Sequence, residues 1–472
     1  MPSGVRVQVP PCAPTRLTPA ARAPSIGRVN HLLREVLPAL GLDDTFAADR
    51  LALAGGNALA SRLPVNTLAC GSVAAAALAG LAMVGGERVL VDPLQVAVAF
   101  RNDQLQTVDG HTQDSFAPLS GFFRTGDGWV RTHGNYPHHR ARLLGALGLP
   151  EDAGREQAQE VLATRAAQDV EDTVTRQGGI AVRVRDHQEW FSGEQAAATA
   201  THPLLSVEGA GAAPAVPLGR RPRVLDLTRV LAGPVASRTL AYLGCDVLRV
   251  DPPGIPELEP QHIDTDAGKR STLLDLGDPQ ALERLHGLLA TADVLLTGYR
   301  PGALDRFGLG AAQLAETYPS LVHASLSAWA PSGPWGGRRG FDSIVQAATG
   351  ISLLESSDAE VPGALPAQAL DHATGYLLAA GVCAALRRRA EEGGTWQVSS
   401  HLARTAHWLL RTDALDGQAT GLGDPAPWLV ESVTELGRVV QSRPAFRIDG
   451  GPAEFAWVGR PWGSDPAQWA QT

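Results

Sequence analysis

The stretch that decides the fold is RVLDLTRVLAGPVASRTLAYLGCDVLRV, residues 223–250. Residues 223–227 form a short apolar run, residues 233–243 have the spacing of a helix, and residues 246–250 form a second apolar run. Short loops join the three segments, and the first loop ends in Ala-Gly-Pro. A strand, a helix and a strand in this order predict a parallel β-α-β unit, the building block of a doubly wound sheet.

Strand and helix patterns continue to alternate after residue 250. The expected elements are strands at 271–276, 293–297 and 321–326 and helices at 279–291 and 311–317. We therefore predict an α/β fold, with a doubly wound, nucleotide-binding-type parallel sheet in a large domain at 222–425. Residues 426–472 are expected to complete that domain.

The chain before residue 222 has a different pattern of strands, helices and loops. Residues 111–205 carry a hairpin pattern around Gly128 followed by three helical patterns, which predicts a second, smaller α+β domain. Residues 206–221 are rich in Ala, Gly and Pro and are predicted to be a linker. Residues 1–25 lack the apolar core of a secretory signal and are predicted to be a disordered tail.

Residues 26–110 contain a loose repeat of a later segment. Leu63-Pro-Val-Asn-Thr-Leu68 precedes an Ala-rich helix pattern, a Gly-Gly pair and a strand, and Leu365-Pro-Ala-Gln-Ala-Leu370 precedes the same series. We expect residues 26–110 to be a partial, degenerate copy of the large-domain helices. In this alignment the first copy has Ala69 where the second has Asp371.

The composition narrows the range of functions. The net charge of the 472 residues is −9, which argues against general nucleic-acid binding. An anionic ligand would therefore need a local basic cluster. The cysteines at 12, 70, 245 and 383 have no metal-type spacing, which fits a reducing cytoplasm. The Ala-rich stretch 73–84 is predicted to be a buried core helix, and no membrane span is expected.

Basic side chains gather in several loops at predicted strand ends. They occur at Lys269-Arg270, between Arg300 and Arg306, and at Arg338-Arg339. Each cluster alone is typical of a solvated surface. Together they predict a polyphosphate site, because open α/β sheets bind ligands at the carboxyl ends of their strands. The Ala232-Gly233 loop would admit a nucleotide-type ligand, although it lacks a GxGxxG pattern and an ordinary tight turn also explains it.

From about residue 222 to 425 the chain resembles the family III CoA-transferases, a family that also contains α-methylacyl-CoA racemases. The motifs that carry the resemblance are Val224-Leu-Asp-Leu-Thr, Ala232-Gly-Pro, Gly244-Cys-Asp-Val-Leu-Arg-Val, Gly268-Lys-Arg-Ser, Ala292-Asp-Val, Arg300-Pro-Gly-Ala-Leu-Asp-Arg306, Gly340-Phe-Asp342 and Leu370-Asp371. The segment Asn135-Tyr-Pro-His-His resembles the second domain of the family. Here that small domain comes first, so the domain order is rearranged and partly duplicated.

The resemblance implies the site. Taken by itself, Asp371 fits an ordinary helix cap. The resemblance implies that it attacks an acyl-CoA thioester and that the reaction passes through a mixed anhydride and an aspartyl-CoA thioester. We expect the helix start after Asp371 to supply N–H donors and to keep the carboxylate ionised. Asp342 would be a second catalytic carboxylate, or else a cap or turn residue. The positions that match CoA-contacting stretches are Leu231, Ala232, Leu274, Asp275, Gly298, Tyr299, Arg300, Arg306, Arg338, Arg339, Gly340 and Phe341.

The predicted function is a CoA-transferase that moves CoA between carboxylic acids. The resemblance implies coenzyme A or acyl-CoA as substrate, no metal or redox cofactor, no nucleic-acid or membrane partner, and a cytoplasmic homodimer. A racemase is an alternative, but racemases of this family carry a histidine where this chain has Phe341. A second alternative is a CoA-binding protein with little catalysis. The histidines at 133, 138 and 139 fit structural roles, or a role in the acyl pocket.

Overall fold

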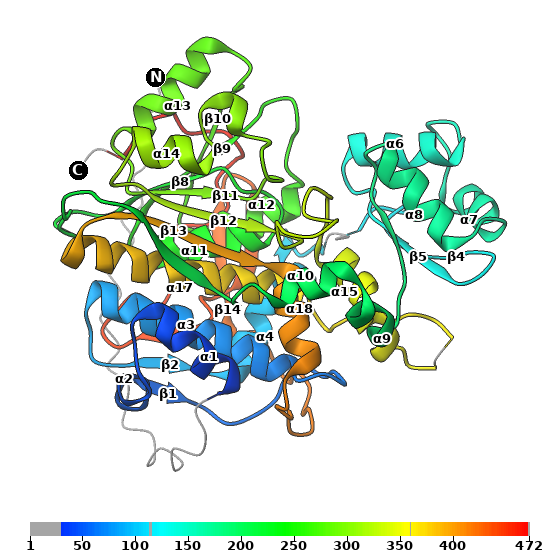
Figure 1. Ribbon diagram of the computed structural model, residues 1–472. Helices are drawn as coiled ribbons and strands as arrows, with labels where there is room; N and C mark the ends of the chain where they lie inside the picture. Colours follow the sequence, from blue (N-terminus) through cyan, green and yellow to red (C-terminus); the bar gives the residue numbers. More distant parts are fainter. Residues whose placement is uncertain (1–29, 113–115, 359, 471–472) are drawn as a thin grey trace.

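The computed structural model describes residues 30–112, 116–358 and 360–470, and the predicted tail at 1–25 lies outside them. Its centre is a seven-stranded sheet with the order β10-β9-β8-β11-β12-β13-β7 (Figure 1). Six strands are parallel and β7 is antiparallel to β13. The strands are β7 (Ser206–Gly211), β8 (Arg223–Asp226), β9 (Asp246–Asp251), β10 (Arg270–Leu273), β11 (Val294–Thr297), β12 (Val322–Ser327) and β13 (Thr395–His401).

Counted from β8, the six parallel strands lie in the order 3-2-1-4-5-6, which confirms the predicted doubly wound fold. Successive residues of β8 face opposite sides of the sheet. Val224 packs into the core around α11 (Ala232–Tyr242) and α17 (Ala369–Glu392). Leu225 packs into the core around α13 (Pro279–Leu289) and α14 (Ala311–Thr317). The strand order reverses between β8 and β11, so the loops that follow them diverge and leave a crevice.

The segment predicted to be a linker, residues 206–221, contains an ordered strand. β7 pairs along β13 from Ser206 to Gly211. The prediction was wrong for this half of the segment because small residues are permissive in conformation, and the unpaired edge of β13 offers hydrogen bonds that the local sequence does not reveal. Residues 212–221 have no regular structure.

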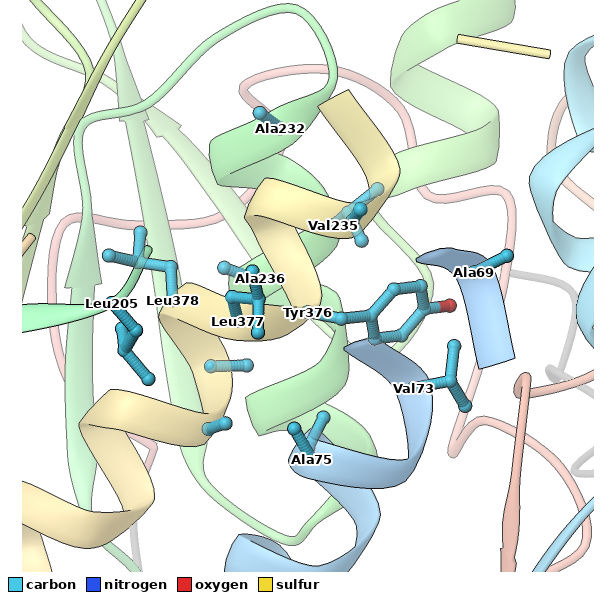
Figure 2. Close-up of a cluster of buried hydrophobic side chains, with 14 of the residues drawn as sticks. Ala69, Val73, Ala75, Leu205, Ala232, Val235, Ala236, Tyr376, Leu377 and Leu378 are labelled. Carbon is cyan, nitrogen blue, oxygen red and sulfur yellow. The ribbon is translucent and has the colours of Figure 1, made fainter. Parts of the chain in front are cut away.

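The N-terminal segment packs against the large domain. Its elements are α1 (His31–Leu40), α2 (Asp44–Arg50), β1 (Leu51–Leu53), α3 (Val65–Val84), β2 (Val89–Val91), α4 (Pro93–Phe100), α5 (Asn102–Leu105) and β3 (Thr107–Val108). Helix α3 lies along α17, and Tyr376 of α17 reaches between α3 and α11 (Figure 2). A Cβ atom at Gly375 would lie 2.3 Å from the Ala232 carbonyl oxygen, so glycine there lets α17 and α11 approach closely. By length and composition α3 and α17 could cross a membrane, but both are buried core helices here.

The C-terminal residues divide between two parts of the molecule. β14 (Leu429–Thr434) and β15 (Gly437–Ser442) form a small sheet with β3, and β16 (Arg447–Ile448) joins β2 and β1. Further on, the Trp457 indole donates to the Lys269 carbonyl oxygen at 2.7 Å, and the backbone N–H of Ser271 donates to Asp465 at 3.0 Å. The last described residues therefore cover the β10 edge of the large sheet.

The small domain stands to one side of the molecule (Figure 1). It has an antiparallel sheet, β4-β5-β6, and three helices around a core of its own. The elements are β4 (Gly121–Arg124), β5 (Trp129–Thr132), α6 (Pro137–Leu147), α7 (Arg155–Ala163), α8 (Ala167–Arg176) and β6 (Ala181–Arg183). The next two helices, α9 (His187–Ser192) and α10 (Glu194–Ala200), pack on α15 (Asp342–Thr349) and α18 (Leu402–Arg411) of the large domain instead.

Helices α3 and α17 begin with the same backbone geometry. Their caps, Pro64 and Gln368, have φ and ψ of −75° and 59°, and of −73° and 62°. In each, the first helical N–H donates to the residue before the cap, at 2.7 Å. In each, the next two N–H groups donate to a distant aspartate, Asp416 for α3 and Asp342 for α17. This geometry pairs Asp371 with Thr67, two residues before the Ala69 suggested by sequence alignment.

Candidate active site

Asp371 lies in the first turn of α17, and the backbone N–H groups of that turn are all used. The N–H groups of Leu370 and Asp371 donate to Asp342 at 2.8 and 3.0 Å. Those of Ala369 and His372 donate to the carbonyl oxygens of residues 367 and 368. The expectation that this helix start supplies donors to a reaction intermediate is therefore wrong in this structure, because the Asp342 carboxylate and two carbonyl oxygens already accept them.

Asp342 holds the start of α17, which carries Asp371, in place. It is the first residue of α15, is 1% exposed, and lines neither of the cavities described below. Besides the two N–H groups, it accepts a hydrogen bond from the Gln346 side-chain amide. Gln346 in turn accepts the N–H of Leu365 at 2.9 Å. Asp342 is thus the cap of α17, supplied by another helix, and it positions Asp371.

The two carboxyl groups titrate as a pair. Burial raises the pKa of Asp342 to about 6, although its hydrogen bonds from Asp371, Gln346 and Leu370 oppose the rise. Burial, and then the charge of Asp342, raise the pKa of Asp371 well above its ordinary value. Within the described residues the Asp371 side chain has no hydrogen-bond partner. Both shifts disfavour ionisation, and the larger rise is at Asp371, contrary to the expectation that the helix start keeps Asp371 ionised.

Asp371 opens into a cavity of about 350 Å³, the Asp371 cavity. The residues that line it include four acids, three amides, a serine, three with aromatic rings and a leucine: Asp103, Glu259, Asp264, Asp371, Asn135, Gln261, Gln368, Ser343, Phe116, His133, Phe341 and Leu231. Among the described residues no arginine or lysine lines it. The cavity is therefore suited to an uncharged group.

A second cavity of about 280 Å³, the arginine cavity, has the opposite character. Four arginines line it, namely Arg229, Arg300, Arg338 and Arg339, and no carboxylate of the described residues does. Burial and the charges of Arg142, Arg339 and Arg229 lower the pKa of His138, which also lines this cavity. Its chemistry suits a ligand with several negative charges.

The two cavities share two wall residues, Val230 and Phe341. Val230 has a φ of 70°, which is strained for a β-branched residue. Its N–H donates to the Glu257 carboxylate at 3.3 Å, and Glu257 also accepts from Arg249 at 2.7 Å. This buried ion network holds the strained loop between the cavities, which is typical of functional sites.

The small domain closes over both cavities. The Tyr136 hydroxyl donates to Glu257 of the large domain, and Arg338 forms an ion pair with Glu171 of α8 at 2.9 Å. Arg339 donates to the carbonyl oxygen of Gly178 at 3.2 Å. His133, just after β5, stacks on Phe341 with ring centroids 3.9 Å apart.

The structure brings most of the predicted ligand-contacting residues together. Gly298, Tyr299, Arg300, Arg338, Arg339, Gly340 and Phe341 all line the arginine cavity. Leu231 lines the Asp371 cavity, and Ala232 begins α11 against Gly375 of α17. These residues follow β8, β11 and β12, which end at the crevice where the strand order reverses.

Besides Ala232, three predicted ligand-contacting residues line neither cavity, namely Leu274, Asp275 and Arg306. Leu274 and Asp275 follow the edge strand β10, away from the crevice, and Asp275 accepts the N–H of Gly277 at 2.9 Å. Arg306 lies over the ring of Phe307, 4.5 Å from its centroid, in the short 3-10 helix Asp305–Phe307.

One of the predicted basic clusters turns inward. The Lys269 ammonium group is fully buried, 3.3 Å from Asp226 and 3.7 Å from Asp266. Arg270 pairs with Asp246 at 2.7 Å. Both cations are occupied by carboxylates of the fold, so the prediction that this cluster contributes to a polyphosphate site was wrong.

Several wall residues were not singled out from the sequence. Arg229 and Val230 lie inside the quoted 223–250 motif, and the positive φ of Val230 has no sequence signal. Asn135 and Phe116 come from the small domain, more than two hundred residues before Asp371. No local pattern links such distant residues.

Residues 222–427 match the family model "CoA-transferase family III". A probable fatty acyl-CoA transferase of Mycobacterium tuberculosis is 36% identical over 184 residues, which is 36% of this chain and 47% of that protein. An acyl-CoA transferase of Gibberella moniliformis is 31% identical over 313 residues, or 61% of this chain and 55% of that protein. A formyl-CoA:oxalate CoA-transferase of Rhodopseudomonas palustris is 31% identical over 208 residues, or 42% and 49%.

The chain spans about half the length of the curated relatives it matches. The matched region contains the doubly wound sheet, Asp342, Asp371 and the four arginines of the arginine cavity. Residues 222–427 of this chain therefore resemble a CoA-transferase family III domain.

Proposed function

We propose that the protein is a CoA-transferase that moves CoA between two carboxylic acids, with Asp371 as the nucleophile. The observation that carries the proposal is the pairing of the two cavities. Asp371, whose carboxyl group has no hydrogen-bond partner among the described residues, lines one cavity; four arginines line the other, and the two meet at Val230 and Phe341. A substrate with a polyanionic end and an acyl end would fill both.

The reaction divides into acyl transfers on Asp371. One carboxylate oxygen attacks the thioester carbonyl carbon, the C–S bond breaks, and CoA thiolate leaves behind a mixed anhydride. The thiolate then attacks the Asp371 carbonyl carbon, which releases the first carboxylic acid as its anion and leaves an aspartyl-CoA thioester. The second carboxylate attacks this thioester, and the same two steps in reverse order return free Asp371 and the new acyl-CoA.

The contrast in wall charge orients the substrate. The phosphates of CoA would lie against the arginines, and the acyl group would lie in the Asp371 cavity. No described arginine or lysine lines that cavity, so its described wall offers no cation to pair with a second carboxylate at the far end of the acyl group. The substrates that fit are acyl groups without a distal negative charge.

The carboxyl pair makes the first step depend on pH. Asp371 must be ionised to attack, yet its pKa is raised by burial and by the charge of Asp342. The rate of acylation should therefore rise as the pH increases through the pKa of Asp371. Acylation removes the charge of Asp371, which relieves its repulsion with Asp342 and favours the approach of the second carboxylate.

The test is the intact mass of the protein after incubation with a panel of acyl-CoAs. The panel pairs acyl groups that end in a methyl group with acyl groups of equal length that end in a carboxylate. The wild type should gain an adduct that hydroxylamine converts into a hydroxamate at Asp371, and Asp371→Asn should gain none. Retained CoA binding without any adduct would favour the alternative of a CoA-binding protein with little catalysis. Cytoplasmic location and a homodimer remain predictions from the resemblance.

A further inference from the structure

The tetrahedral intermediates of the proposed reaction carry a negative oxygen that needs a hydrogen-bond donor. The usual source, a helix start beside the nucleophile, is closed here because Asp342 and the preceding carbonyl groups already accept the first four N–H groups of α17. The donor must therefore come from another part of the cavity wall.

His133 is an imidazole in that wall. It follows β5 in the small domain and is 4% exposed. Its backbone N–H donates to the Ile180 carbonyl oxygen at 3.1 Å, which ties it to β6. Its ring lies nearly parallel to that of Phe341, 6° from coplanar with centroids 3.9 Å apart. Both its backbone and its ring plane are thus fixed.

The His133 ring has unused hydrogen-bonding capacity. Among the described residues its buried Nδ1 atom has no partner beyond the backbone of His133 itself. Such a group costs free energy unless something satisfies it. Burial, and then the charge of Arg131, lower the pKa of His133 to about 3, so the imidazole is neutral and carries a single N–H. A neutral imidazole can donate a hydrogen bond without giving up its proton.

We propose that His133 is a catalytic residue, whose N–H hydrogen-bonds the acyl oxygen as Asp371 attacks the thioester. The carbonyl electron pair moves onto that oxygen while the bond from Asp371 forms, and it returns as the C–S bond breaks. No proton changes place, so His133 is unchanged at the end. This inference rests on the proposed CoA-transferase function.

Phe341 has a defined part in this arrangement. It follows Gly340 and precedes Asp342, and its ring separates the two cavities. By stacking on His133 it couples the small domain to the loop that carries Asp342. The small domain would therefore supply a reacting group from the same chain as Asp371.

The test measures adduct formation by intact mass at several acyl-CoA concentrations. His133→Phe keeps a ring that can stack on Phe341 and removes the donor. It should slow adduct formation at saturating acyl-CoA by about 10²-fold and leave the half-saturating concentration unchanged. His133→Asn keeps an N–H donor and should recover part of the rate. A purely structural role would not give this split or this rescue.

His407→Phe is the matched control. His407 also has an unpartnered Nδ1 and lies edge-on to a phenylalanine, Phe191, at 5.2 Å, but it is on α18 and lines neither cavity. The rate of adduct formation in His407→Phe should equal that of the wild type.

Equal rates for His133→Phe and wild type at saturation would overturn the inference. Solvent deuterium entering the α-carbon of acyl-CoA in the wild type, and lost in His133→Phe, would also overturn it, because His133 would then be a base. Absence of any adduct in the wild type would instead contradict the proposed function itself.

Discussion

Helices α3 and α17 begin alike and differ at one position of their first turn. The caps Pro64 and Gln368 have nearly the same φ and ψ, and each start donates two N–H groups to an aspartate far away in the sequence. At the third helical residue α3 has Thr67 and α17 has Asp371. The Thr67 hydroxyl donates to Asp416 at 2.6 Å, whereas the Asp371 carboxyl group has no hydrogen-bond partner among the described residues and lines a cavity.

The comparison separates the scaffold from the chemistry. Both helix starts are capped by an aspartate from a distant part of the chain, Asp416 for α3 and Asp342 for α17. Only at α17 does the third side chain face open space, and only there do loops of the large sheet supply arginines nearby. The reactive site therefore depends on one side chain and on its surroundings, and the predictions below test each in turn.

The largest effect is expected from substituting the third residue of α17, with a matching substitution in α3 as the control. Asp371→Asn keeps the shape of the side chain and removes the nucleophile, so adduct formation should fall by about 10³-fold or more. Thr67→Val makes a similarly small change at the matching position of α3 and should leave the rate unchanged. Intact mass after incubation with acyl-CoA measures both, and equal losses in the two variants would contradict the comparison.

The next effect concerns the two capping aspartates. Asp342→Asn removes the charge that raises the pKa of Asp371, so Asp371 should ionise at lower pH. The midpoint of the pH dependence of adduct formation should then move down by about one pH unit. Asp416→Asn, the control at α3, should leave the midpoint in place. The measurement is the rate over the range of about pH 6 to 9, and an upward shift would refute the assigned coupling.

A smaller effect is expected in the arginine cavity, which has no counterpart beside α3 among the residues described. Arg300→Ala removes an exposed cation, and the acyl-CoA concentration for half-maximal rate should rise by about 5-fold to 10-fold with an unchanged maximal rate. Added salt should raise the acyl-CoA concentration for half-maximal rate more in the wild type than in the variant. Arg306→Ala, an arginine outside the cavity, serves as the control and should behave as the wild type does.

A carboxylate at α3 should not create a second site. Thr67→Asp would place a new acid beside Asp416, and the adduct should remain at one per chain because Thr67 lines neither cavity. The two acids would repel each other, so the free energy of unfolding should fall by about 1–2 kcal/mol at neutral pH. Thermal unfolding and the adduct stoichiometry test this, and a second adduct would contradict it.

The smallest effect is one of stability, and its sign follows from the raised pKa of Asp371. A carboxyl group whose pKa is higher in the folded state makes folding less favourable once the pH exceeds its unfolded value near 4. Asp371→Asn should therefore raise Tm at about pH 8 by about 1–3 °C, and the gain should vanish in acid, where the carboxyl group is neutral in both states. Asp342→Asn, measured at the same pH, also removes a buried charge, but it disturbs the hydrogen bonds that cap α17 as well. A lower Tm for Asp371→Asn would count against the assigned coupling.

Local patterns were sufficient to predict most of the sheet and the helix start that carries Asp371. The alternation of apolar runs and helical spacing over 223–326 predicted β8 to β12 and three of their helices within a few residues, because strand and helix periods are properties of adjacent residues. The basic loops at 298–300 and 338–339 were also placed correctly, since the doubly wound fold brings the carboxyl ends of its strands to one crevice.

Sequence thus determined the α/β class, the resemblance of residues 222–427 to CoA-transferase family III, and the choice of Asp371 as the candidate nucleophile. The tertiary structure alone decided that Lys269 turns inward, that Asp342 caps α17 and that His133 stacks on Phe341. These outcomes depend on contacts between residues far apart in the chain, where burial and ion pairing decide which groups remain free. A side chain's type can be read from the sequence, but its hydrogen-bond partners and its charge state are set by what the whole fold packs around it.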